Sequence, residues 1–264
     1  MSSDYTTSPC RQFELMNLGM VHREINFSRS VLFMAEIDLS EIEAIRSQCS
    51  KDTRPSYTAF VAKAVGLSLK EFPYANRRLY RPFGLPFLWR YQNFTASDIA
   101  IAIEVDLDDI HSVAYMEILT DTDRRPLTEL TEQLRQFSSS REASPQWQSF
   151  SWVGLKVPRP FQGLLVSLPL WIPSLWRRYR GAASMISSPA KYGVDSLVTS
   201  WSHPLSFSFG LAQEKALAVE GEVVARPAFT FCMNFDRRIM AGAQAARFFN
   251  SVCEKLRKPQ AMEA

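Results

Sequence analysis

The sequence predicts an α/β sandwich in which helices cover one face of a mostly antiparallel or mixed sheet. Three observations lead to this class: a β-rich run followed by a helical pattern at residues 30–49, a long helical pattern at 56–72, and an apolar run that leads into a helix near the C-terminus. No long polar linker divides the 264 residues, of which 46% are hydrophobic. We therefore expect a flexible tail over residues 1–12 and a single domain over residues 13–264.

The first elements follow from residue patterns. Residues 30–37 are rich in β-formers and end at Asp38, which with Ser40 can cap a helix over residues 41–49. The helix over residues 56–72 is the most regular element because its apolar side chains recur on one stripe until a proline stops it.

The middle of the chain is less regular. Residues 77–94 contain two prolines and a glycine, which predict an irregular connection. Residues 98–105 and 113–118 predict a β-hairpin, and Thr122 or Asp123 could cap the helix that follows.

Charge is unevenly distributed in residues 143–194. This segment has no Asp or Glu but carries six basic residues and four tryptophans. Its apolar centre, 161–176, is too short to span a bilayer and is interrupted by Pro169 and Pro173. Residues 145–180 could therefore contact an anionic membrane surface peripherally, pack on a protein partner, or cap the protein's own core.

Bulk properties exclude several function classes. A net charge of +3 and a pI near 8.7 lack the clustered basic footprint of a nucleic-acid binder. The cysteines form no C-x-x-C pair and make no metal-ligand spacing with the histidines, so we expect reduced, inert thiols and no metal. The N-terminus is polar and acidic, unlike a secretory signal, which predicts a cytoplasmic protein. The four cysteines are Cys10, Cys49, Cys232 and Cys253, and the three histidines are His22, His111 and His203.

The C-terminal motif is a predicted strand, turn and helix. The turn reads Asp236-Arg237-Arg238-Ile239-Met240-Ala241-Gly242, and the helix that follows places its apolar side chains on one face. These side chains are Ala245, Phe248, Phe249 and Val252.

This motif resembles the Asp-His-Arg-x-x-x-Gly signature of the 2-oxoacid dehydrogenase acyltransferases and of chloramphenicol acetyltransferase, and the resemblance extends over about residues 30–256. Asp236, Arg238 and Gly242 match, but Arg237 stands where the resemblance places the catalytic histidine, and Ala241 replaces its Asp or Asn companion. A guanidinium is always protonated and has no acceptor, so Arg237 cannot serve as a base. Ordinary acyl transfer through this turn is therefore not expected.

A second motif, A-S-M-I-S-S-P-A-K-Y-G at 183–193, resembles the family phrase F-T-[IV]-S-[NS]-[LIV]-G. The resemblance assigns Ser187 to oxyanion stabilisation, although Met185, Pro189 and Ala190 depart from the phrase and Ser187 could equally be a turn serine. His203 is the only histidine near the C-terminal motifs and is either a substitute base or a hydrogen-bonded loop residue.

The resemblance implies a chloramphenicol acetyltransferase-like two-layer sandwich that forms a homotrimer, with each active site between subunits. It also implies an acyl thioester ligand, on coenzyme A or on the phosphopantetheine of an acyl-carrier partner. The candidate catalytic residues are Ser187, Arg237, Arg238 and His203. The sequence does not identify the residues that bind the coenzyme. This sequence holds no lipoyl domain, so no lipoyl attachment is expected. The alternative to an enzyme with altered chemistry is a pseudoenzyme, a non-catalytic trimeric scaffold or binding protein.

Overall fold

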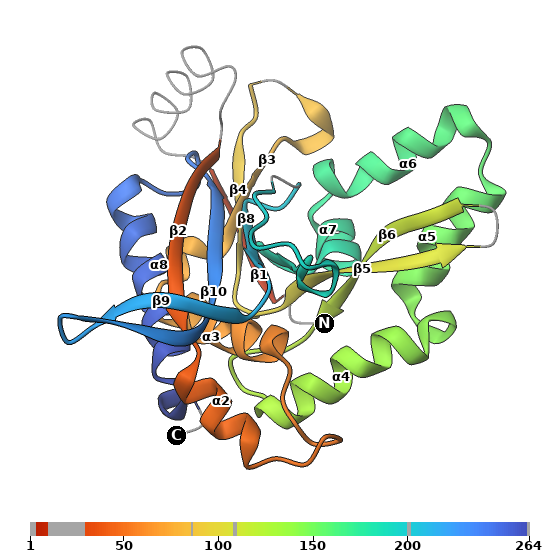
Figure 1. The fold of residues 1–264 in the computed structure, drawn as a ribbon. Coiled ribbons are helices and arrows are strands. Elements are labelled where there is room, and N and C mark those ends of the chain that lie inside the picture. Colours follow the sequence, from red (N-terminus) through yellow and green to blue (C-terminus); the bar gives the residue numbers. More distant parts are fainter. Residues whose placement is uncertain (1–3, 10–29, 86, 108–109, 200–201, 263–264) are drawn as a thin grey trace.

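The structure is a computed structural model that describes residues 4–85, 87–107, 110–199 and 202–262, apart from 10–29 (Figure 1). Cys10, His22, both ends of the expected N-terminal tail and part of the hairpin turn after residue 107 lie outside the described residues.

The centre of the protein is a seven-stranded mixed sheet with the order β2-β10-β8-β7-β5-β6, in which β9 also pairs with β10. Its pairs are antiparallel except for β5 with β7 and β7 with β8, which are parallel. The predicted mixed sheet is confirmed. The strands are β2 (Ser30–Asp38), β5 (Ile99–Leu107), β6 (Ile110–Leu119), β7 (Ser184–Ser187), β8 (Leu205–Phe209), β9 (Gln213–Val219) and β10 (Glu222–Asp236).

Two helices, α3 (Tyr57–Glu71) and α8 (Gly242–Arg257), pack on one face of this sheet. α3 begins at Ser56, whose hydroxyl accepts a hydrogen bond from the Ala59 amide at 3.1 Å, as expected of an N-cap. The predicted face of α8 is confirmed, because Phe248 is fully buried and Phe249 stacks on Phe231 with ring centroids 5.6 Å apart. The core therefore lies between these helices and alternate side chains of the central strands.

A smaller antiparallel sheet occupies a part of the chain for which no strands were expected. It has the order β1-β4-β3, with β1 (Tyr5–Pro9), β4 (Arg90–Phe94) and β3 (Arg77–Tyr80). Residues 5–9 are thus a paired strand and not a flexible tail, and residues 77–94 contain two strands. These strands are held by backbone hydrogen bonds between strands. The sequence does not indicate this pairing, because turn-forming residues lie between β3 and β4.

Two shorter helices are α2 (Ser40–Ser47) and α4 (Leu127–Ser139). The expected cap of α4 is wrong, because the helix starts after Pro126. The Thr122 hydroxyl instead donates to the Ser97 carbonyl at 2.5 Å, which fixes the connection from the hairpin. Single 3-10 turns complete the described chain: η1 (Pro73–Ala75), η2 (Pro82–Gly84), η3 (Arg141–Ala143), η4 (Ala190–Tyr192) and η5 (Pro259–Met262).

The basic, Trp-rich segment forms α5 (Pro145–Lys156), α6 (Arg159–Trp171) and α7 (Pro173–Arg180) before β7. These helices lie beside the β5–β6 hairpin, away from α3 and α8 (Figure 1). α7 packs into the protein through Trp176, which is 1% exposed, whereas Trp152 and Phe161 are 57% and 58% exposed. One end of the segment therefore caps the protein's own core, and the other end presents apolar side chains to solvent.

Candidate functional site

The turn between β10 and α8 is built around Asp236. Its amide donates to the Pro204 carbonyl at 2.8 Å, and its carboxylate accepts from the Arg238 guanidinium, with Nε 2.9 Å from Oδ1 and 3.0 Å from Oδ2. The Arg238 amide also donates to Oδ1 at 2.9 Å. The Arg238 side chain therefore stabilises the turn to which it belongs.

Two side chains from the smaller sheet hold this turn from outside. The Arg77 Nε donates to the Ile239 carbonyl at 2.9 Å, and the Tyr91 hydroxyl donates to the Arg238 carbonyl at 2.9 Å. The Arg77 guanidinium also lies 4.2 Å from the centre of the Tyr91 ring. The backbone around residue 237 is thus fixed by partners that come from a distant part of the chain.

Arg237 projects from this anchored turn and is exposed. Within the described part of the chain, its side chain makes no hydrogen bond or ion pair. Ala241 is exposed as well, and its amide donates to the Gln244 side chain at 3.0 Å, which caps the start of α8. The turn thus presents a guanidinium to solvent at the position that the motif gives to a histidine.

Ser187 lies at the end of β7 and is half-buried. The register places it beside Ser208, which pairs with Cys232. Arg237 follows Cys232 by five residues, or about 17 Å along the strand, and two strand spacings add about 10 Å sideways. Ser187 and Arg237 are therefore not brought together within a single chain.

A cavity of about 350 Å³ does bring His203 and Arg238 into one lining. His203 is buried, its ring lies 5.0 Å from Trp176, and its Nε2 is 2.8 Å from the Arg180 carbonyl. If Nε2 carries the proton and donates to this carbonyl, Nδ1 is an acceptor, and no side chain or backbone group in the described residues bonds to it. Burial lowers the pKa of His203 to about 4, so the ring is neutral at physiological pH.

The same cavity contains a residue that the sequence reasoning missed. Arg78 is 3% exposed, donates from Nε to Gln92 at 2.7 Å and from Nη1 to the Leu170 carbonyl at 3.1 Å, and stacks 4.1 Å over Trp176. Burial lowers its pKa to about 9. The sequence alone does not distinguish Arg78 from its neighbour Arg77. Successive side chains of a strand point to opposite faces, so in β3 Arg78 points to the cavity and Arg77 to the turn.

Other candidate chemistries find little support among the described residues. No cluster of three or more His, Cys, Asp or Glu side chains suited to a metal occurs there. Cys232 and Cys253 are buried, which raises the pKa of both thiols, that of Cys253 to about 11. None of the helices in the described ranges has the length and apolar character needed to cross a bilayer.

Comparison with known proteins connects this turn and fold to one group. The sequence model of the 2-oxoacid dehydrogenases acyltransferase family (catalytic domain) matches residues 179–264, which include Ser187 and the Asp236 turn. The chain resembles the 2-oxoacid dehydrogenase acyltransferases. Over 237 residues it is 22% identical to the dihydrolipoyllysine-residue acetyltransferase component of the pyruvate dehydrogenase complex of Bacillus subtilis (strain 168). The match covers 87% of this chain but 45% of that relative.

Solved structures show that the acyltransferase fold extends over nearly the whole chain. The cubic core of the pyruvate dehydrogenase multienzyme complex superposes with a TM-score of 0.62 at 17% identity, covering 97% of this chain and 93% of that one. The Azotobacter vinelandii dihydrolipoamide acetyltransferase gives 0.63 at 17% identity with the same coverage. A chloramphenicol acetyltransferase gives 0.52 at 12% identity, covering 95% and 100%. The expected chloramphenicol acetyltransferase-like fold is confirmed.

Proposed function

We propose that this protein binds an acyl thioester, on coenzyme A or on carrier-protein phosphopantetheine, at the interface between the protomers of a homotrimer. The observation that carries the proposal is the exposed Arg237 on a turn fixed by Arg77, Tyr91 and Asp236. A turn held this firmly fixes the backbone of Arg237 in advance, so binding restricts only the Arg237 side chain.

The distance between the two motifs favours a shared site. Ser187 and Arg237 lie far apart in one protomer, so they can act on one ligand only if they come from two copies of the chain. The relatives' fold and the family resemblance both support this arrangement. The trimer is therefore part of the proposal and not an independent addition to it.

In this site Arg237 donates hydrogen bonds to the carbonyl or phosphate oxygens of the ligand, and Ser187 adds a hydroxyl donor. Crystallographic and enzymatic investigations of the Azotobacter vinelandii enzyme address the role of a serine, a histidine and an asparagine in its catalytic mechanism. By the family motif, this chain has Ser187, Arg237 and Ala241 at these positions. Donors are present but the turn supplies no base, so the site binds and polarises a thioester better than it activates an acceptor.

A non-catalytic scaffold is the second candidate function. It is favoured by the loss of both the histidine and its companion from the turn, while the fold and the anchored geometry are kept. The two candidates differ in one measurable property, because only the first requires a thioester to bind at Arg237.

Calorimetric titration of acetyl-coenzyme A into the wild-type protein, Arg237→Ala and Arg237→Lys tests the proposal. We expect wild-type binding and a loss of about 10- to 100-fold in Arg237→Ala, because charge-assisted hydrogen bonds are removed. Arg237→Lys recovers part of the affinity through its charge but not the planar, two-donor geometry. Absence of wild-type binding, with the mass of a trimer in scattering, favours the scaffold. A monomer overturns the shared site.

A thiol-release assay then tests the chemistry. We expect wild-type turnover with acetyl-coenzyme A and dihydrolipoamide to stay near background, and the double variant Arg237→His with Ala241→Asn to exceed it by about 100-fold or more, because a base is restored. Vigorous wild-type turnover that His203→Ala abolishes would instead identify His203 as a substitute base.

A further inference from the structure

An apolar groove of about 860 Å³ lies between the β5–β6 hairpin and the three helices α5, α6 and α7. Small side chains and a glycine leave room for it: Ala102 and Ala114 on the hairpin and Gly154 on α5. Larger apolar residues such as Val153 and Leu165 line its helical side. A concave, mostly apolar site of this size has the character of a small-molecule pocket.

The groove continues into the apolar surface beside it. Trp152 and Val166 line the groove and are 57% and 48% exposed, whereas Leu155 and Phe161, which are 80% and 58% exposed, do not line it. The groove therefore lies between two layers of this chain and is open to solvent along part of its lining.

One charged side chain of α7 reaches this apolar lining. Arg180 is half-buried, its Nη1 lies 3.4 Å from the Met116 sulfur, and its backbone carbonyl is occupied by His203. No carboxylate of the described residues pairs with its guanidinium. Burial without an acidic partner lowers the pKa of Arg180, which means that the cation is held in a poorly solvated place.

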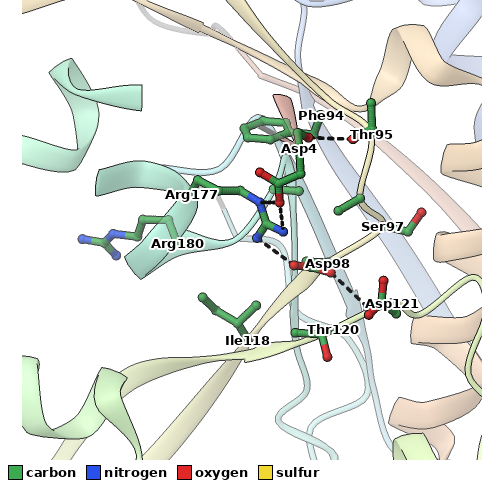
Figure 2. A network of polar contacts seen from close by, with 12 residues as sticks. Asp4, Phe94, Thr95, Ser97, Asp98, Ile118, Thr120, Asp121, Arg177 and Arg180 are labelled. Atoms are coloured by element: carbon green, nitrogen blue, oxygen red, sulfur yellow. Dashed lines mark hydrogen bonds and ion pairs between the residues drawn. The ribbon is translucent and has the colours of Figure 1, made fainter. Parts of the chain in front are cut away.

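The neighbouring Arg177 shows what a satisfied arginine on this helix looks like. Its guanidinium lies between two carboxylates, with Nε 2.6 Å from Asp4 Oδ2 and Nη1 2.7 Å from Asp98 Oδ2. Figure 2 shows Arg180 one turn along the same helix, pointing away from this pair of acids. These two arginines of one helix therefore differ in their counter-ions: Arg177 lies between Asp4 and Asp98, whereas no carboxylate among the described residues pairs with Arg180.

We propose that this groove binds a long-chain aliphatic carboxylate, with the hydrocarbon chain in the apolar lining and the carboxylate on Arg180. The carboxylate supplies the missing counter-ion, and a planar guanidinium binds it with two parallel hydrogen bonds. A single aliphatic chain occupies an apolar groove without placing polar atoms in it. This site is separate from the proposed thioester site, and it does not depend on Arg237.

The first experiment titrates saturated fatty carboxylates of increasing chain length into the wild-type protein, below their micelle-forming concentrations, with Trp152 in the lining as a fluorescence reporter. We expect one molecule bound per chain and an affinity that rises about fourfold per added methylene, until the groove is full. The methyl ester of the best carboxylate should bind about 10- to 100-fold more weakly, because it cannot form the charged pair.

Matched variants assign the two ends of the ligand. Arg180→Gln should weaken the carboxylate to the level of its methyl ester, whereas Arg178→Gln, on the exposed side of the same helix, should leave it unchanged. Gly154→Leu should abolish binding by filling the groove, because no atom lies within 4 Å of a Cβ added there. Gly163→Leu on α6 is equally unobstructed but does not line the groove, so it should bind as the wild type does.

Three results would overturn the proposal: no binding of any chain length, affinity independent of length, or an Arg180→Gln variant that binds the carboxylate as tightly as the wild type does. Flotation with anionic vesicles provides the remaining comparison. If the protein binds vesicles but not monomeric carboxylates, and Gly154→Leu leaves vesicle binding intact, the apolar segment is a membrane contact and the groove is not a ligand site.

Discussion

The helices α3 and α8 resemble α5, α6 and α7 in apolar content but differ in how far their apolar side chains are buried. In the first pair, Phe60 and Phe248 are completely buried against the central sheet. In the second group, Trp176 is 1% exposed, while Leu155 and Phe161 face solvent. Apolar composition therefore predicts that a helix has a hydrophobic face, but the layer opposite decides whether that face becomes core or an exposed surface.

The strongest test of this comparison is Phe248→Ala in α8. Its ring packs against Phe207 and Phe72, with centroid distances of 6.1 and 6.3 Å, so truncation leaves a cavity in the main core. We expect the free energy of unfolding to fall by about 3 to 5 kcal/mol. Urea denaturation followed by circular dichroism measures this loss, and a loss below about 1 kcal/mol would show that the layer is more loosely packed than its burial indicates.

His203 joins the two regions, since it precedes β8 and bonds to the last residue of α7. Its pKa is 6.5 in an unfolded chain and about 4 when folded, so the unfolded state binds more protons between these values. The free energy of unfolding should therefore fall by roughly 3 kcal/mol as the pH drops from 6.5 to 4, and this contribution is complete above pH 6.5. Denaturation across this range should show a smaller slope in His203→Asn, and equal slopes would mean that the pKa of His203 is the same in the folded and unfolded states.

Arg177 tests how the outer helices are attached. Arg177→Gln leaves the Asp98 carboxylate, 4% exposed, without its cationic partner. We expect a loss of about 2 kcal/mol in the free energy of unfolding, below the range for fully buried pairs because the Arg177 side chain is 20% exposed. Arg178→Gln is the control and should stay within about 0.5 kcal/mol of the wild type. Equal values for the two variants would exclude the ion pairs as an anchor.

The smallest effect is expected for Phe161→Ser in α6. This ring is more than half exposed, so removing it costs little packing, and the free energy of unfolding should change by less than about 0.5 kcal/mol. The same denaturation measurement checks it. A loss as large as that of Phe248→Ala would show that α6 is covered by another layer in solution.

The regular elements could be predicted because their signals are local. The helix that ends before Pro73 and the strand, turn and helix around Asp236 each carry a periodic pattern and a stop or a cap. The β3 and β4 strands carry no such signal, since Arg77 and Arg78 put a basic residue on both faces. Their structure depends on pairing with each other and with β1, which begins at Tyr5, and a local pattern does not contain that information.

The residues of the candidate site also differ in whether a local sequence signal indicates them. Ser187 and Arg237 could be proposed from motifs in which the order of residue types is itself the signal, and their roles stay predictions. Arg78, Arg180 and the groove could not, because their properties depend on which side chains pack around them. Among the described residues, no carboxylate pairs with either guanidinium, and Gly154 leaves room in the groove. Such vacancies are created by packing between distant segments, and no single stretch of sequence records them.

The contact of Arg177 with Asp4 joins residues separated by 173 positions, and its contact with Asp98 joins the residue before β5 to the same helix (Figure 2). Closing so long a loop carries an entropic cost that local helix formation does not. We expect α7 to acquire its final position only after β1 has paired with β4, so that these segments open and close as one unit in hydrogen exchange. A cut between β1 and the rest of the chain would then increase hydrogen exchange in α7, which is distant from β1 in the sequence but close to it in space.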